Sequence, residues 1–388
     1  MKQTRFPFIL SLVSCLLPLI CSALLLLSCS APQKNTETFS SLTHSQKNQY
    51  ATYFKIYKEE NFSALVTYLN TDKTDSVVYV LYKNKKSTLN TKAYYVKMPI
   101  RSAACMGSVF VGALNNLQLL NYINAIDNVD YICNPTIKKK CAEKNIQQLN
   151  KNGVLNIEQT LVCNPQIIFT NPSGDPKKDF DARLLKATII PVVCADYFEN
   201  TALARAEWVK AFALFFNEEK QADSLFSSIE KKYLQLKNLV DTCRYKPTVF
   251  TELKTGDVWF VAGGKSNMAQ LLKDAGATYV FNDNDKTGAL SLNMEQVISK
   301  AAHADYWLNL HYSNTAADIL KQDKRYEIFN ACKKRNLYNN NAIISETGGN
   351  AYWEYGLNRP DELLADMIKI FHPTLLPNHP LKYYKQLK

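Results

Sequence analysis

Two glutamates occupy the same place in two near-copies of one pentapeptide, and ionic pairing with a partner is the chemistry they could supply. The copies are Leu155-Asn156-Ile157-Glu158-Gln159 and Leu292-Asn293-Met294-Glu295-Gln296. Asn is a favoured helix N-cap, Gln three positions later can close a capping box, and a carboxylate in the first turn suits the helix dipole. A strand-like apolar run follows each copy, at 165–169 and at 304–308. The pattern predicts one helix-then-strand unit with an acidic tip in each half of the chain, although two ordinary capped helices would show the same residues.

Residue patterns for metal binding or catalysis are absent from the sequence. No CxxC, no His/Asp/Glu cluster at ligand spacing and no Gly-x-Ser-x-Gly elbow occurs. Gly263-Gly264-Lys265-Ser266 is not a phosphate loop, because Trp259 stands where such a loop needs its first glycine. We interpret it as a turn into a helix over 267–274, and we expect no catalytic residue, no bare metal site and no cofactor.

The N-terminus is typical of an exported lipoprotein. Lys2 and Arg5 precede an apolar run over 6–27, which ends in Leu26-Leu27-Ser28-Cys29. This end is similar to a lipobox, which predicts a signal peptide over 1–28 and lipidation of Cys29. The alternative is an uncleaved anchor, because the run is just long enough to span a bilayer.

Charge and cysteine content place few further limits on function. Removal of residues 1–28 lowers the formal net charge from +11 to +9, which suits anionic ligands, but no aromatic-interleaved basic patch indicates nucleic acid. Seven cysteines remain beyond Cys29, so at least one is unpaired. A disulfide between Cys133 and Cys141 is one option, and several of the others stand in apolar runs where Cys acts as a small hydrophobe.

Strand and helix patterns alternate along most of the chain. A polar tether over 29–49 leads to a β-rich extension over 50–98, and strands then alternate with helices as in parallel α/β folds. A long amphipathic helix over 217–242 separates an N-terminal α/β lobe, 99–216, from a C-terminal α/β lobe, 243–388. The predicted fold class is α/β, with two Rossmann-like lobes of mostly parallel sheets joined by one long helix.

Together these features resemble the helical-backbone class of ABC-importer substrate-binding proteins, the periplasmic receptors for vitamin B12, ferric siderophores and haem. The resemblance covers about residues 99–376. It is carried by the two Leu-Asn-x-Glu-Gln units, Ile190-Pro191-Val192-Val193, Gly276-Ala277, Arg359-Pro360-Asp361 and Phe371-His372-Pro373. It implies that Glu158 and Glu295 are surface carboxylates that pair with arginines of a membrane permease, for which Arg forks are suited.

Ligands of open α/β lobes bind off the carboxyl ends of the strands. Aromatic side chains gather in the loops that we expect there, and such faces suit planar metal complexes. Each aromatic, taken singly, could equally belong to the core. His311 could contact a haem or corrin metal, or be an ordinary surface histidine. The candidate ligand-binding residues are Met106, Ser108, Tyr131, Tyr197, Trp259, Lys265, His311, Tyr352 and Trp353.

The sequence therefore predicts a non-enzymatic, lipid-anchored binding protein of an ABC importer, facing the periplasm and monomeric. It would carry a chelated metal, an iron–siderophore complex or haem, to an ABC permease and ATPase complex. A corrinoid is the alternative ligand. An enzyme or sensor on a related two-lobe fold is the alternative of a different class.

Overall fold

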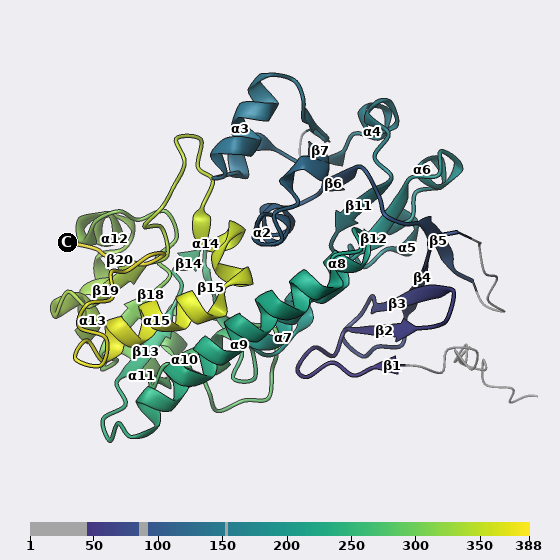
Figure 1. Ribbon diagram of the computed structural model, residues 1–388. Helices are drawn as coiled ribbons and strands as arrows, with labels where there is room; N and C mark the ends of the chain where they lie inside the picture. The colour runs from purple at the N-terminus through teal and green to yellow at the C-terminus, as the bar shows by residue number, and fades with distance from the viewer. Residues whose placement is uncertain (1–44, 85–91, 152–153) are drawn as a thin grey trace, which may run out of the picture. The chain divides into compact units, whose positions relative to one another are not determined.

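The computed structural model describes residues 45–84, 92–151 and 154–388 (Figure 1). The predicted signal peptide, Cys29 and nearly all of the tether therefore lie outside the described residues. Within the described part, no helix is both long and apolar enough to cross a membrane.

The first lobe is built on a five-stranded sheet in which every neighbouring pair is parallel. Its strands are apolar runs covered on both faces, as expected for a parallel sheet; Ile167, Ile168 and Phe169 are all buried. In spatial order the strands are β12 (Ile190–Val193), β11 (Ile167–Thr170), β6 (Ala103–Cys105), β7 (Ile123–Ile126) and β8 (Gln147–Gln148).

The second lobe has a sheet of the same size, with one antiparallel strand at its edge. A small antiparallel sheet of β14 (Lys254–Thr255), β15 (Val258–Ala262) and β17 (Ala289–Leu292) accompanies it. In spatial order the main strands are β16 (Thr278–Tyr279), β13 (Thr248–Thr251), β18 (Tyr306–Leu308), β19 (Leu337–Asn339) and β20 (Lys385–Gln386). Parallel sheets in two lobes confirm the predicted fold class.

Helices alternate with these strands in both lobes. Those before residue 217 are α2 (Ser108–Asn116), η1 (Leu120–Tyr122), η2 (Val129–Tyr131), α3 (Pro135–Ala142), α4 (Ile157–Cys163), α5 (Pro176–Asp179), α6 (Ala182–Lys186), η3 (Asp196–Phe198), α7 (Ala202–Glu207) and α8 (Val209–Leu214). Those after residue 242 are α10 (Asn267–Asp274), α11 (Met294–Ala301), α12 (Ala316–Gln322), η4 (Lys324–Ile328), α13 (Asn330–Lys333), α14 (Ala351–Glu354), η5 (Gly356–Asn358) and α15 (Pro360–Phe371).

The long helix α9 (Glu219–Asp241) joins the two lobes, as the ribbon shows (Figure 1). Its 23 residues span about 35 Å at the usual rise. Near its start, the Gln221 side chain donates to the carbonyl of Leu117 in the first lobe at 3.0 Å. Farther along, the Tyr233 hydroxyl donates to Asp274 of α10 in the second lobe at 2.8 Å. The apolar stripe seen in the sequence faces inward, with Phe226 and Ile229 fully buried.

The N-terminal extension forms a separate five-stranded sheet. Two buried glutamates of the first lobe hold the stretch that leads into it. Glu207 accepts hydrogen bonds from the backbone N–H groups of residues 49, 50 and 51, and Glu199 accepts from those of residues 52 and 53. The strands are β1 (Ser45–Gln46), β2 (Phe54–Lys58), β3 (Phe62–Tyr68), β4 (Ser76–Tyr82) and β5 (Tyr94–Lys97).

A further link between the lobes runs through α14. Glu354, fully buried, accepts hydrogen bonds from the backbone N–H groups of Cys133 and Asn134 in the first lobe. Gly112 of α2 lies so close to α14 that a Cβ there would meet the carbonyl oxygen of Glu354 at 1.6 Å. The carboxyl-end loops of the two lobes are therefore held together at this point.

Candidate ligand-binding site

In the first lobe, a charged cluster lies just beyond the carboxyl ends of β11 and β12. Asp196 is buried and accepts a hydrogen bond from the Arg205 guanidinium at 2.9 Å and from the Asn171 amide at 3.1 Å. Asn171 also donates to the carbonyl of Cys194, which ties the two strand ends together. The cluster presents the partly exposed Arg205 beside Tyr197, whose hydroxyl donates to the carbonyl of Pro172.

In the second lobe, a matching cluster follows the carboxyl ends of β13 and β18. His311 Nε2 lies 3.3 Å from one oxygen of Glu252, and Asn309 donates to the other at 3.2 Å. All three residues have left-handed backbone, with φ of 69° at Glu252, 61° at Asn309 and 49° at His311. Non-glycine residues adopt this conformation at an energetic cost, and such strain clusters at functional sites.

Tyr352 of α14 links the two clusters. It is fully buried, and burial is the main reason why its pKa is raised to about 12; the charge of Glu252 also raises this pKa, and the Tyr384 hydrogen bond and the charge of Arg205 lower it. One charged group of each cluster is therefore near enough to act on this hydroxyl.

Exposed aromatic side chains surround these clusters. Tyr131 of η2 is 56 % exposed, Tyr197 of η3 is 44 % exposed and Trp353 of α14 is 51 % exposed. Tyr312, next to His311, is 95 % exposed. Tyr131, Tyr197 and Tyr312 follow the carboxyl ends of β7, β12 and β18, and Trp353 lies in α14, farther along the chain after β19.

The other candidate residues differ in where they lie. Trp259 is fully buried, packs against Trp307 with ring centroids 5.7 Å apart, and donates to the carbonyl of Thr251, so it is a core residue. The Tyr352 ring is buried as well and supports the site from beneath. Met106 and Ser108 are half-buried where β6 passes into α2.

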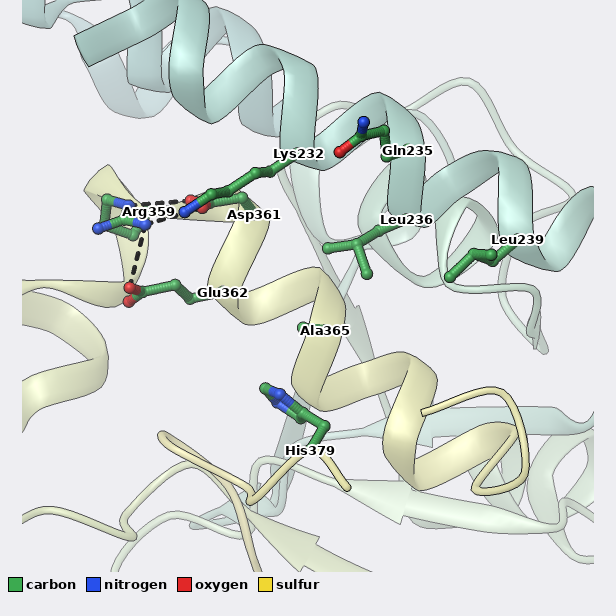
Figure 2. Close-up of a pocket in the computed structure, with 9 residues that line it drawn as sticks. All are labelled: Lys232, Gln235, Leu236, Leu239, Arg359, Asp361, Glu362, Ala365 and His379. Atoms are coloured by element: carbon green, nitrogen blue, oxygen red, sulfur yellow. Dashed lines mark hydrogen bonds and ion pairs between the residues drawn. The ribbon is translucent and has the colours of Figure 1, made fainter. Parts of the chain in front are cut away.

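Lys265 belongs to a different region. It lines a cavity of ≈ 830 Å³ at the start of α10, together with Lys246 and Lys273. Another cavity, of ≈ 430 Å³, lies between α9 and α15 and is lined by Leu236 and Arg359 among others (Figure 2). Figure 2 shows the Arg359 guanidinium paired with Asp361 and Glu362, at 2.8 Å and 3.1 Å. The larger cavity is also lined by Asn200 and Thr201 of the first lobe and by Tyr279, at the carboxyl end of the parallel strand β16, whereas the smaller one is lined by α9, α15 and His379.

The two acidic tips are exposed and N-capped as predicted. Glu158 lies in the first turn of α4, where Asn156 accepts a hydrogen bond from the backbone of Gln159, and Glu295 lies in the first turn of α11. A complete capping box forms at Asn293. At the first tip the Gln159 side chain instead donates to Gln147.

Sequence reasoning did not identify Glu252, Asp196 and Arg205 as parts of the site. Nothing in the sequence marks left-handed backbone at Glu252, and the Asp196–Arg205 pair is one of many acid–base pairs in a charged chain. In the described part of the chain, no group of three or more His, Cys, Asp and Glu side chains is placed to hold a metal ion. The seven cysteines beyond Cys29 are free, including Cys133 and Cys141.

Comparison with known proteins gives consistent results. The sequence model of the periplasmic binding protein family matches residues 104–342, more than half of the chain. An uncharacterised lipoprotein of Methanocaldococcus jannaschii is 30% identical over 240 residues, 61% of this chain and 55% of the relative, so the chain spans about half the length of that relative.

Two solved structures share the fold. An ABC-type Fe3+-hydroxamate transport system from Saccharomonospora viridis is 17% identical with a TM-score of 0.53, covering 71% of this chain and 94% of its own. The periplasmic haem-binding protein RhuT from Roseiflexus sp. RS-1 is 15% identical with a TM-score of 0.52, covering 71% of this chain and 99% of its own.

Proposed function

Because the chain belongs to the periplasmic binding protein family, in its helical-backbone class, we propose that it is a lipid-anchored receptor for a chelated metal. The ligand is an iron–siderophore complex or haem, which the receptor delivers to an ABC permease. Cys29 carries the lipid, and Glu158 and Glu295 are the docking carboxylates. The protein binds and releases its ligand without chemical change.

The exposed aromatic side chains at the carboxyl ends of the strands carry this proposal. Tyr131 and Tyr197 come from the first lobe, and Tyr312 and Trp353 come from the second. Exposed aromatic side chains that gather at one edge offer faces which large planar or lipophilic complexes can cover. The names of the haem-binding and Fe3+-hydroxamate structures that share the fold support the same ligand classes.

The charged groups at this edge add polar contacts. Arg205 keeps a partly exposed guanidinium beside Tyr197 and could meet an anionic group of a chelate. His311 is one-third exposed and its Nε2 faces Glu252, so the carboxylate orients the ring. With Nε2 turned to Glu252, the other ring nitrogen, Nδ1, is the one that could contact a ligand oxygen or an axial metal position.

Ligand binding is tested with the soluble chain from about residue 30, titrated with a ferric hydroxamate, haemin and cyanocobalamin. Intrinsic fluorescence reports binding, because Trp208, Trp259 and Trp307 are buried and Trp353 is half-exposed. Trp353→Ala should weaken binding of the preferred ligand about tenfold, since it removes one stacking face. Tyr245→Ala is the matched control, because Tyr245 is 63 % exposed but precedes β13 at the opposite edge of the sheet.

Failure to bind any of the three compounds would refute the proposed ligand class. An equal loss of ligand affinity in Trp353→Ala and in Tyr245→Ala would refute the proposed location of the site.

Docking is tested with Glu158→Ala combined with Glu295→Ala. This variant should no longer stimulate the permease ATPase but should keep its ligand affinity, because both carboxylates lie on the exposed tips. Loss of ligand binding instead would show that these residues have another role.

A further inference from the structure

A second duplicated feature accompanies the two acidic tips. Each tip carries an Asp-x-Arg turn that comes from a later element: Asp181-Ala182-Arg183 at the start of α6 and Asp323-Lys324-Arg325 at the start of η4. The surrounding sequences are unrelated, so the likeness appears only when the side chains are compared.

The two turns have the same geometry. Asp181 accepts the backbone N–H of Arg183 at 2.8 Å and its guanidinium at 3.0 Å and 2.7 Å. Asp323 accepts the backbone N–H of Arg325 at 3.0 Å and its guanidinium at 3.0 Å and 2.7 Å. The aspartate side chains are 22 % exposed at Asp181 and 14 % exposed at Asp323, while the arginine side chains are 66 % exposed at Arg183 and 54 % exposed at Arg325.

Helix stability explains the aspartates but not the arginines. An aspartate at the N-cap satisfies a free backbone N–H group and suits the positive end of the helix dipole. A cation in the first turn is disfavoured by that same dipole. An exposed ion pair also contributes little to the free energy of unfolding. The recurrence of Arg at this position therefore needs a reason outside the fold.

Each arginine lies near the glutamate of its own tip. Helices α4 and α6 pack side by side on the first lobe (Figure 1). The pKa of Arg183 is raised, first by its hydrogen bond to Asp181 and also by the charge of Glu158. The pKa of Arg325 is raised in the same way, first by Asp323 and also by Glu295. The geometry of the second tip agrees, because Asp323 lies 3.7 Å from Lys254 Nζ of β14, β14 pairs with β15, and α11 packs on β15. Each tip thus exposes a carboxylate and a guanidinium on neighbouring elements.

We propose that Arg183 and Arg325 are docking residues that meet acidic side chains of the permease, next to the basic side chains that Glu158 and Glu295 meet. This inference rests on the proposed function, in which the glutamates dock. The fork to aspartate fixes the direction of each guanidinium before docking, which reduces the ordering cost of binding. Because each tip carries two opposite charges side by side, it can pair with the permease surface in only one alignment. A single charge would not fix that alignment.

Charge complementarity favours a protein partner. A uniformly anionic surface, such as a membrane, would attract the arginine and repel the adjacent glutamate, so the pair gains little there. A protein surface with alternating basic and acidic side chains is attracted by both groups at each tip. Because the glutamate–arginine pair occurs at both tips, the partner must offer such a surface at two places.

The test measures affinity of the full-length protein for the ABC permease complex of the same host, held in nanodiscs, by biolayer interferometry. Arg183→Gln with Arg325→Gln should weaken binding about tenfold, and Arg183→Glu with Arg325→Glu about a hundredfold, because reversal adds like-charge repulsion. Both losses should shrink at high salt. Lys220→Gln with Lys231→Gln removes the same charge from exposed positions on α9 and should stay within about twofold of wild type.

Two further variants separate the possible failures. Arg183→Lys with Arg325→Lys keeps the charge, and it should bind better than the glutamine variant. Glu158→Gln with Glu295→Gln tests the proposed function directly. If this glutamate variant loses permease binding while the Arg→Gln and Arg→Glu double variants bind as wild type, the inference is overturned and the proposed function stands. If the glutamate variant binds as wild type too, the tips have no docking role. Unchanged circular dichroism confirms folding of each variant.

Discussion

Glu207→Gln should release the stretch that leads into the N-terminal extension and should destabilise the protein by about 3–5 kcal/mol. The Glu207 side chain is fully buried and accepts the backbone N–H groups of Gln49, Tyr50 and Ala51 at 3.0, 2.8 and 2.8 Å. It also pairs with Lys210 at 3.0 Å. Oε1 accepts from Gln49 and Lys210, and Oε2 accepts from Tyr50 and Ala51, so the one oxygen of a glutamine can keep one pair of donors while its NH₂ group faces the other pair, which loses its acceptor.

Urea denaturation at neutral pH measures this loss, and hydrogen exchange at the amides of residues 49–51 locates it. Glu219→Gln is the matched control, because Glu219 also joins the extension to a helix, through Lys58 at 2.7 Å. Both side chains of that pair are about one-third exposed, so its loss should cost under about 1 kcal/mol. The idea that buried carboxylates hold this stretch would be refuted by two results together. These are a loss of unfolding free energy in Glu207→Gln no larger than in the control, and unchanged hydrogen exchange at the amides of residues 49–51.

Three other perturbations test separate parts of the structure. Gly112→Ala should lower the thermal unfolding midpoint strongly, because the new Cβ would meet the Glu354 carbonyl at 1.6 Å; an unchanged midpoint would contradict the close packing of α2 on α14. Asn293→Ala should cost about 1 kcal/mol in urea denaturation by removing the α11 N-cap. The Arg325 fork lowers the pKa of Asp323 from 3.8 to about 2, so its contribution to stability is present above 3.8 and is lost as the pH falls through about 2. The stability difference between wild type and Asp323→Asn, followed by urea midpoints, should therefore vanish across that interval.

Regular elements were predictable from the sequence because their signals are local. The helix expected at 267–274 has those bounds in α10, and the β-rich extension expected over 50–98 contains β2, β3, β4 and β5. The Asn caps of α4 and α11 were also predictable, since capping depends on residues only three apart. At Asn156 the capping box does not close, because the Asn156 backbone N–H that Gln159 would accept donates instead to the carbonyl of Leu149 at 2.6 Å.

The ligand-facing residues were only partly predictable. Exposed Tyr131, Tyr197 and Trp353 were identified because the carboxyl ends of parallel strands share one edge of the sheet. Trp259 was placed at the same edge, but it lies on an antiparallel strand whose side chain turns into the core. The sequence cannot distinguish these cases, because both show an aromatic residue after a strand. The Glu252–His311 contact depends on two loops 59 residues apart that meet only in the folded lobe.

The two lobes are alike at their tips and unlike at the edge proposed for the ligand. Each tip combines an N-capped glutamate with an aspartate–arginine fork, although the sequences around the forks share nothing else. At the ligand-facing edge, the first lobe presents Arg205 on Asp196, whereas the second presents His311 on Glu252. A single asymmetric ligand needs no likeness between the groups that touch it. A partner that presents one docking surface twice, as a pair of like subunits does, requires likeness at the two points of contact. Under the proposed function, the repeated tips are those expected for a partner made of two like subunits, and the unlike clusters are those expected for an asymmetric cargo.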